Sequence, residues 1–112
     1  MPQLDNKIAI VTGAASGFGA AIARSYIEAG AKVLLADING EAAARLADEL
    51  GANARAATCD VTNGEQVQAA VQLCVQTFGV PDIVVNNAGT THRNQPLMDV
   101  DEKTFDRVFA VN

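Results

Sequence analysis

Short apolar runs alternate along the chain with longer segments in which apolar residues recur every three or four positions. We interpret four compact runs as buried strands, at residues 7–12, 32–36, 54–59 and 82–86. Segments 17–29, 41–50 and 64–78 have the periodicity of amphipathic helices, and a last helical pattern covers 101–112. The order of elements is therefore predicted to be β-α-β-α-β-α-β-α.

The predicted strands are rich in Val, Ile and Leu and show no alternation of polar and apolar residues. Such runs are typical of parallel sheets that helices cover on both faces. Because β-α-β crossovers are right-handed, the expected fold is an open, doubly wound α/β sheet of Rossmann type with strand order 3-2-1-4. That arrangement is somewhat more than the first half of a dinucleotide-binding fold, in one domain that covers residues 1–112.

Composition narrows the function classes. The 112 residues are 49% hydrophobic and 19% charged, with a net charge of −5, and the chain has no basic run. This balance argues against a nucleic-acid or anionic-membrane surface. The two cysteines, Cys59 and Cys74, match no metal-ligand spacing and are expected to be buried, reduced thiols. Since the sequence shows neither a signal peptide nor a membrane span, a soluble, cytoplasmic protein without a metal site is expected.

A glycine-rich turn joins the first predicted strand to the first helix, with the sequence TGAASGFG at residues 12–19. Gly13 permits a tight turn, Gly17 lets a phosphate approach the backbone, and Gly19 lets the helix lie close to the strand. The helix then directs its free N–H groups and positive dipole end at a pyrophosphate. Three glycines alone could also serve only as a turn and a helix start. The predicted cofactor-binding residues of this segment are Gly13, Ala15, Ser16, Gly17, Phe18 and Gly19.

An acidic residue, Asp37, ends the second predicted strand about 20 residues after Gly19, where a dinucleotide fold places the acid that binds the ribose. A carboxylate accepts hydrogen bonds from the 2′- and 3′-hydroxyls of NAD and repels the 2′-phosphate of NADP. Neither residues 14–16 nor Ile38 supplies a Lys or Arg for that phosphate. NAD is therefore favoured over NADP, with Asp37 and Ile38 in its site; an N-cap or Asx turn before Gly40 is the alternative role for Asp37.

Four motifs follow one another along the chain: residues 12–19, the acid after the second strand, CDVT at 59–62 and NNAG at 86–89. Together they resemble the classical short-chain dehydrogenase/reductase family, and the resemblance covers the whole chain. It implies that the Asp60 side chain and the Val61 backbone contact adenine. Considered alone, Asp60 is also suited to cap the helix that follows.

The resemblance also assigns roles to residues that follow the fourth strand. It implies that Asn87, Ala88 and Gly89 lie along the cofactor and that Asn87 steadies the sheet. Asn112 matches the supporting asparagine of the catalytic tetrad, although an asparagine at the end of a helical pattern is usually a C-cap.

The remaining catalytic groups of the family, a Ser and a Tyr-x-x-x-Lys pair, come from a fifth strand and its helix. The only tyrosine here, Tyr26, has Gly30 four residues later. We therefore expect an incomplete domain that lacks a downstream catalytic segment and is inactive by itself.

Two functions are compatible with these features. The first is an NAD-dependent oxidoreductase that transfers a hydride between nicotinamide and a small alcohol or ketone. The resemblance implies a 3-oxoacyl-reductase-like or secondary-alcohol dehydrogenase-like enzyme that assembles as a homo-oligomer, a tetramer or a dimer. The second is a stand-alone, non-catalytic dinucleotide-binding or interaction module. An intact mass well above 11.6 kDa would favour the enzyme.

Overall fold

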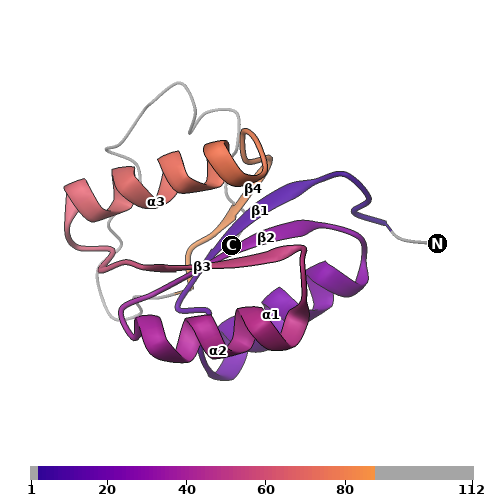
Figure 1. The fold of residues 1–112 in the computed structure, drawn as a ribbon, viewed down its shortest axis with the longest axis horizontal. Helices are drawn as coiled ribbons and strands as arrows, with labels where there is room; N and C mark the ends of the chain where they lie inside the picture. Colours follow the sequence, from indigo (N-terminus) through magenta and orange to yellow (C-terminus); the bar gives the residue numbers. More distant parts are fainter. Residues whose placement is uncertain (1–2, 88–112) are drawn as a thin grey trace.

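The computed structural model of the chain describes residues 3–87, in which helices pack on both faces of a four-stranded sheet (Figure 1). The strand order is β3-β2-β1-β4 and every pairing is parallel, as the sequence predicts. The elements in chain order are β1 (Ile8–Thr12), α1 (Gly17–Glu28), β2 (Lys32–Asp37), α2 (Gly40–Leu50), β3 (Ala54–Thr58), α3 (Gly64–Thr77) and β4 (Ile83–Val85).

The sheet separates two hydrophobic cores. Helices α1 and α2 cover one face and α3 covers the other (Figure 1). Val11, Val33 and Leu35 point to the first core, while Ile10 and Leu34 point to the second, because successive side chains of a strand face opposite sides. Strands β1 and β2 are thus buried on both faces, which explains their continuous apolar runs.

Several element ends differ from the predicted ones by a residue or two. Strand β2 continues to Asp37 because Asp37 pairs with Thr58 of β3. Helix α2 begins at Gly40, one residue before the predicted start, since the Asn39 side chain accepts the Ala42 N–H and caps the helix. Strand β4 is shorter than predicted and runs only over Ile83–Val85.

The buried face of α1 was predicted only in part. The three- and four-residue spacing of Phe18, Ile22, Tyr26 and Ala29 predicts one apolar face for this helix, but Phe18 is 75% exposed. The residues of α1 that are fully buried are the small Gly19 and Ala23, with Ile22 and Tyr26 half-buried beside them. The small residues Gly19 and Ala23 let α1 pack closely against the sheet, and Phe18 lies outside this contact.

Cys59 and Cys74 are free and buried, as predicted. Burial raises the pKa of both thiols, that of Cys74 to about 12, and the nearby Asp60 and Asp82 carboxylates act in the same direction on Cys59 and Cys74 respectively.

We expect the free energy of unfolding to fall as the pH rises from about 9 towards 12, because the unfolded Cys74 thiol ionises in this range and the folded one does not. Urea unfolding between pH 8 and pH 10.5 would measure this. The slope should be shallower in Cys74→Ala, and an identical slope would contradict the assignment to Cys74.

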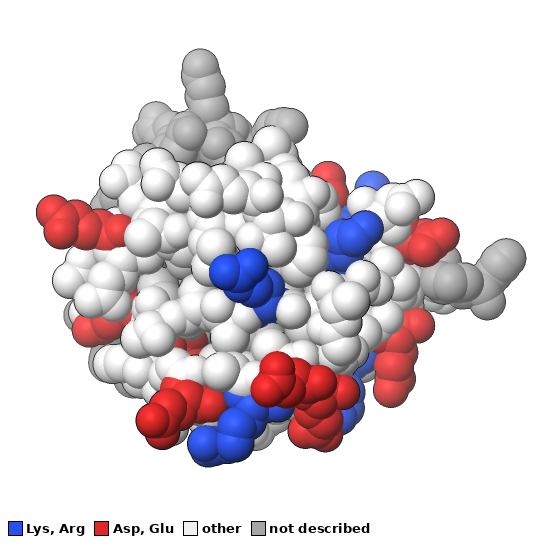
Figure 2. Space-filling model, in the orientation of Figure 1, with Lys and Arg blue, Asp and Glu red and all other residues white. Residues whose placement is uncertain are grey.

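The surface of the described part carries mixed charges. On the face shown in Figure 2, acidic side chains gather along the lower rim, where Figure 1 places α2, with basic side chains between them. One ion pair joins Arg24 of α1 to Glu49 of α2 at 3.2 Å. Among residues 3–87, no helix is long and apolar enough to cross a membrane, and no cluster of His, Cys, Asp or Glu could hold a metal ion.

Candidate functional site

The glycine-rich turn lies between the carboxyl end of β1 and the amino end of α1. Gly13 and Gly17 both have positive φ, at 62° and 59°, a conformation that residues with a side chain adopt only with strain. A Cβ built on Gly17 would meet no atom of residues 3–87 within 4 Å, so the backbone of this residue faces open space in the described part of the chain. The turn therefore presents bare backbone to any ligand that binds here.

Gly19 brings α1 close against the turn. A Cβ at this buried position would overlap the carbonyl oxygen of Gly13 and would lie 2.9 Å from Nδ2 of Asn87. The absence of a side chain at Gly19 thus lets the helix lie against the strand end, as the motif predicts.

The amino end of α1 differs from those of the other two described helices. Asn39 caps α2 and Asn63 caps α3 through their side chains, and each helix has a glutamate in its first turn. In contrast, Ser16 makes no side-chain capping bond and the first turn of α1 contains no acidic residue. Because the first N–H groups of a helix have no partner within it, the start of α1 combines free donors with positive dipole charge. Such an end is suited to bind an anion such as a phosphate.

A buried hydroxyl connects the turn to the end of β4. Thr12, only 2% exposed, accepts a hydrogen bond from the Asn87 N–H through Oγ1 (2.8 Å). The same oxygen lies 3.3 Å from the carbonyl oxygen of Val85 and 3.2 Å from Oδ1 of Asn86, to which it can donate. Asn87 in turn donates from Nδ2 to the Gly13 carbonyl (3.3 Å), so it links β4 to the turn. Sequence reasoning missed Thr12, although a lone threonine that ends an apolar strand was a usable signal.

Thr12→Val is expected to lower the free energy of unfolding by about 1–3 kcal/mol, because it keeps the shape of the side chain but leaves the Asn87 N–H without its acceptor. Urea denaturation of both chains would measure the loss. Thr77→Val, at the exposed end of α3, is the matched control and should change stability little. Equal stability of Thr12→Val and the unmodified chain would contradict a role for this hydroxyl.

Asp37 connects the same turn to β2. Its Oδ2 accepts the Ala15 N–H at 2.9 Å, and its Oδ1 accepts the Asn39 N–H at 2.8 Å in an Asx-type turn. The Asx turn considered for Asp37 is therefore confirmed, whereas the N-cap role is wrong, because Asn39 caps α2. An ionised carboxylate has about four acceptor positions, so the two that remain can accept hydroxyl donors.

Asp60 lies in the loop between β3 and α3. Its Oδ1 accepts hydrogen bonds from the N–H and the hydroxyl of Thr62, at 2.9 and 2.7 Å, and these bonds lower the pKa of the Asp60 carboxyl. The capping role considered for Asp60 is wrong: Asn63 accepts the N–H groups of Glu65 and Gln66 instead. The N-x-x-Q spacing of residues 63–66 resembles a capping box and could have identified Asn63.

The structure brings most of the predicted site residues to one edge of the sheet. The turn, Asp37 and Asn87 are joined by the hydrogen bonds described above, while Phe18 and Ile38 are exposed apolar side chains, 75% and 68% accessible. Asp60 and the half-buried Val61 directly follow the end of β3. Three predicted site residues lie outside the described residues: Ala88, Gly89 and Asn112.

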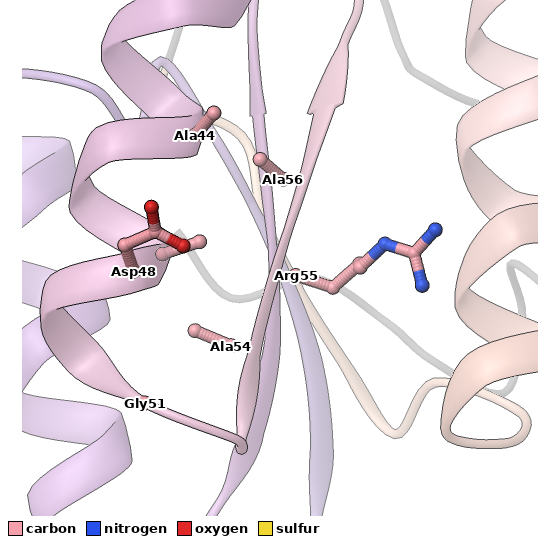
Figure 3. Close-up of a pocket in the computed structure, with 7 residues that line it drawn as sticks. Ala44, Asp48, Gly51, Ala54, Arg55 and Ala56 are labelled. Atoms are coloured by element: carbon pink, nitrogen blue, oxygen red, sulfur yellow. The ribbon is translucent and has the colours of Figure 1, made fainter.

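A separate depression of about 380 Å³ lies between α2 and the amino half of β3 (Figure 3). Small residues form much of its lining, including Ala44, Ala54 and Ala56, and the Arg55 side chain points away from α2. The amino ends of parallel strands share one edge of the sheet, so a depression at the amino half of β3 lies away from the carboxyl ends, where the glycine-rich turn is. It therefore contributes nothing to the site at that edge.

Comparison with known proteins agrees with this geometry. The family described as short chain dehydrogenase matches residues 7–112. The chain is 53% identical to 4-formylbenzenesulfonate dehydrogenase of Comamonas testosteroni and 41% identical to 3beta-hydroxysteroid dehydrogenase 2 of Eggerthella lenta; the alignments cover 98% and 99% of this chain but 45% and 44% of those proteins. The chain thus spans less than half of the length of these relatives.

Solved structures share the fold. The 3-ketoacyl-(acyl-carrier-protein) reductase of Brucella melitensis, complexed with NADH, is 40% identical with a TM-score of 0.77, over 95% of this chain and 44% of that one. A short chain dehydrogenase/reductase of Burkholderia phymatum in complex with NAD is also 40% identical, with a TM-score of 0.71, over 76% and 31% of the two chains. The sequence match over nearly the whole chain and the shared sheet topology place it in one family: the chain belongs to the short-chain dehydrogenases.

Proposed function

We propose that this chain is the NAD(H)-binding part of an oxidoreductase that interconverts a secondary alcohol and a ketone. The observation that carries the proposal is the uncapped amino end of α1 beside the open backbone of Gly17. Free N–H donors, positive dipole charge and space for a ligand coincide there, as a pyrophosphate requires. The NADH and NAD complexes of two structural relatives support the same choice of ligand.

The remaining site residues fit the other parts of such a cofactor. The free acceptor positions of Asp37 suit the two ribose hydroxyls, and the exposed Ile38 offers an apolar contact to a base. Asp60, whose Oδ1 accepts both hydrogen bonds from Thr62, keeps Oδ2 to accept a hydrogen bond from the adenine amino group. Asn87, Ala88 and Gly89 are proposed to line the cofactor further along.

Bound nicotinamide supplies or accepts the hydride, whereas the protein orients the cofactor and shields it. Tyr26 cannot serve as a proton donor at this edge, because it lies half-buried on α1 against the core. We therefore propose that this chain binds NADH without turnover by itself, and that Asn112 supports catalysis only together with a Ser, a Tyr and a Lys from outside these residues. A small alcohol or ketone as substrate and assembly into a dimer or tetramer belong to the same proposal.

NADH is expected to bind more tightly than NADPH, because the Asp37 carboxylate would face the 2′-phosphate and no Lys or Arg lies in residues 14–16 or at position 38. Titration calorimetry with both cofactors tests this. The difference in affinity between NADH and NADPH should be smaller in Asp37→Ala. It should be smaller still in a double variant that also carries Ile38→Arg. Equal affinities of the unmodified chain for NADH and NADPH would contradict the role of Asp37 in selecting NAD.

A further inference from the structure

We infer that Asp37 is a positioning residue for the pyrophosphate turn, in addition to any contact with ribose. The inference rests on the proposed function, since it concerns the same cofactor site. The Asp37 Oδ2 atom accepts the Ala15 N–H at 2.9 Å. The carboxylate therefore holds the backbone of the turn that would receive a diphosphate.

This bond is one of two hydrogen bonds that join the turn to β2. The other runs from the Ala14 N–H to the Ala36 carbonyl and is longer, at 3.3 Å. The turn is bounded by Gly13 and Gly17, and glycine, which has no Cβ, leaves the backbone free to adopt other conformations. Without the Asp37 contact, a single long hydrogen bond would hold the turn to β2.

Asp37 is itself held in place on two sides. Its Oδ1 accepts the Asn39 N–H at 2.8 Å, and its backbone carbonyl accepts the Cys59 N–H at 2.9 Å. The side chain is therefore oriented by the start of α2 while its backbone is tied to the end of β3. A carboxylate fixed in this way can impose one conformation on the turn across the sheet edge.

The two roles of Asp37 predict different effects of Asp37→Ala on the affinity for a ligand that has a diphosphate but no ribose hydroxyls. The probe is 2′,3′-dideoxyadenosine diphosphate, which an acceptor of ribose hydroxyls cannot recognise. If Asp37 only binds ribose, Asp37→Ala should leave this affinity unchanged or raise it, because a negative charge near the diphosphate is removed. If Asp37 positions the turn, the same substitution should weaken binding about tenfold, the effect of losing a hydrogen bond to a charged group.

Two further variants sharpen the comparison. Asp37→Asn removes the charge and keeps a single acceptor oxygen, so its side chain can accept either the Ala15 N–H or the Asn39 N–H but not both. Its affinity for the dideoxy diphosphate should therefore lie between those of Asp37→Ala and the unmodified chain. Asp82→Ala is the matched control, because Asp82 also accepts a backbone N–H, that of Ile8 at 3.0 Å, and directly precedes β4 at the amino ends of the strands. It should leave the affinity for the dideoxy diphosphate unchanged.

Amide hydrogen exchange at Ala15, measured by NMR without ligand, tests the contact independently of binding. Exchange should be slow in the unmodified chain, intermediate in Asp37→Asn and fastest in Asp37→Ala. Unchanged Ala15 exchange in Asp37→Ala, or unreduced affinity of that variant for the dideoxy diphosphate, would overturn the inference. Failure of the unmodified chain to bind NADH and adenosine diphosphate would instead contradict the proposed function, and it would be seen before any substitution is made.

Discussion

Gly17→Val is expected to weaken NADH binding by at least about a hundredfold, equivalent to about 2.8 kcal/mol of binding free energy. The valine side chain would project into the open space over the turn, where a pyrophosphate must approach the N–H groups of α1. Since none of the described residues has an atom within 4 Å of that Cβ, the fold should survive, at a cost of about 1–2 kcal/mol for a side chain at positive φ. Calorimetry and thermal unfolding of the same sample separate the two effects.

Gly64→Val is the matched control for this substitution. Gly64 is the first residue of α3, as Gly17 is of α1, and a Cβ there also meets no atom of the structurally described residues within 4 Å. Its φ is not in the positive range, so the backbone accepts a side chain. Gly64→Val should bind NADH as the unmodified chain does. NADH affinity retained in Gly17→Val would place the pyrophosphate elsewhere.

Gly19→Ala is expected to have the largest effect on stability, with a loss of about 3 kcal/mol or more in the free energy of unfolding. The added methyl group would overlap the Gly13 carbonyl oxygen and crowd the Asn87 side chain, both of which belong to the connection between β1, α1 and β4. Rigid backbone atoms cannot move aside as the end of a flexible side chain can. Helix α1 must therefore shift away from the sheet.

Urea and thermal denaturation would measure this loss, with Gly64→Ala as the control that adds the same methyl group at an open position. The control should be neutral or slightly stabilising, because alanine favours helix more than glycine does. A Gly19→Ala chain as stable as the control would show that α1 can relax at this contact and would remove the argument for close packing there.

The order of elements and the class of fold could be predicted from local signals. The apolar runs of β1 and β2 reflect burial on both faces, which leaves a pattern in consecutive residues. The roles of the three glycines of the turn could also be predicted. Gly13 and Gly17 have positive φ, and Gly19 lets α1 approach the backbone of the turn, both of which favour glycine. These features depend on neighbours within a few positions, so the sequence contains them directly.

Hydrogen-bond partners were harder to predict than elements. Asp37 and Asp60 each precede a helix and were both considered as caps, yet Asn39 and Asn63 take that role. All four side chains can accept backbone N–H groups, and only the path of the chain decides which one lies over the first turn. Phe18 shows the same limit for packing, because helical periodicity does not specify which side of a short apolar face meets the sheet.

The sequence by itself determined the alternation of strands and helices, the position of the glycine-rich turn and the acid after β2, because each is encoded in a short stretch of chain. Only the tertiary structure decided how the parts of the site hold one another. The Asp37 contact to Ala15 joins residues 22 positions apart, and the Thr12 contact to Asn87 joins residues 75 positions apart. Such contacts arise because parallel strands bring their carboxyl ends to one edge, and the residue types alone do not specify which donor meets which acceptor there.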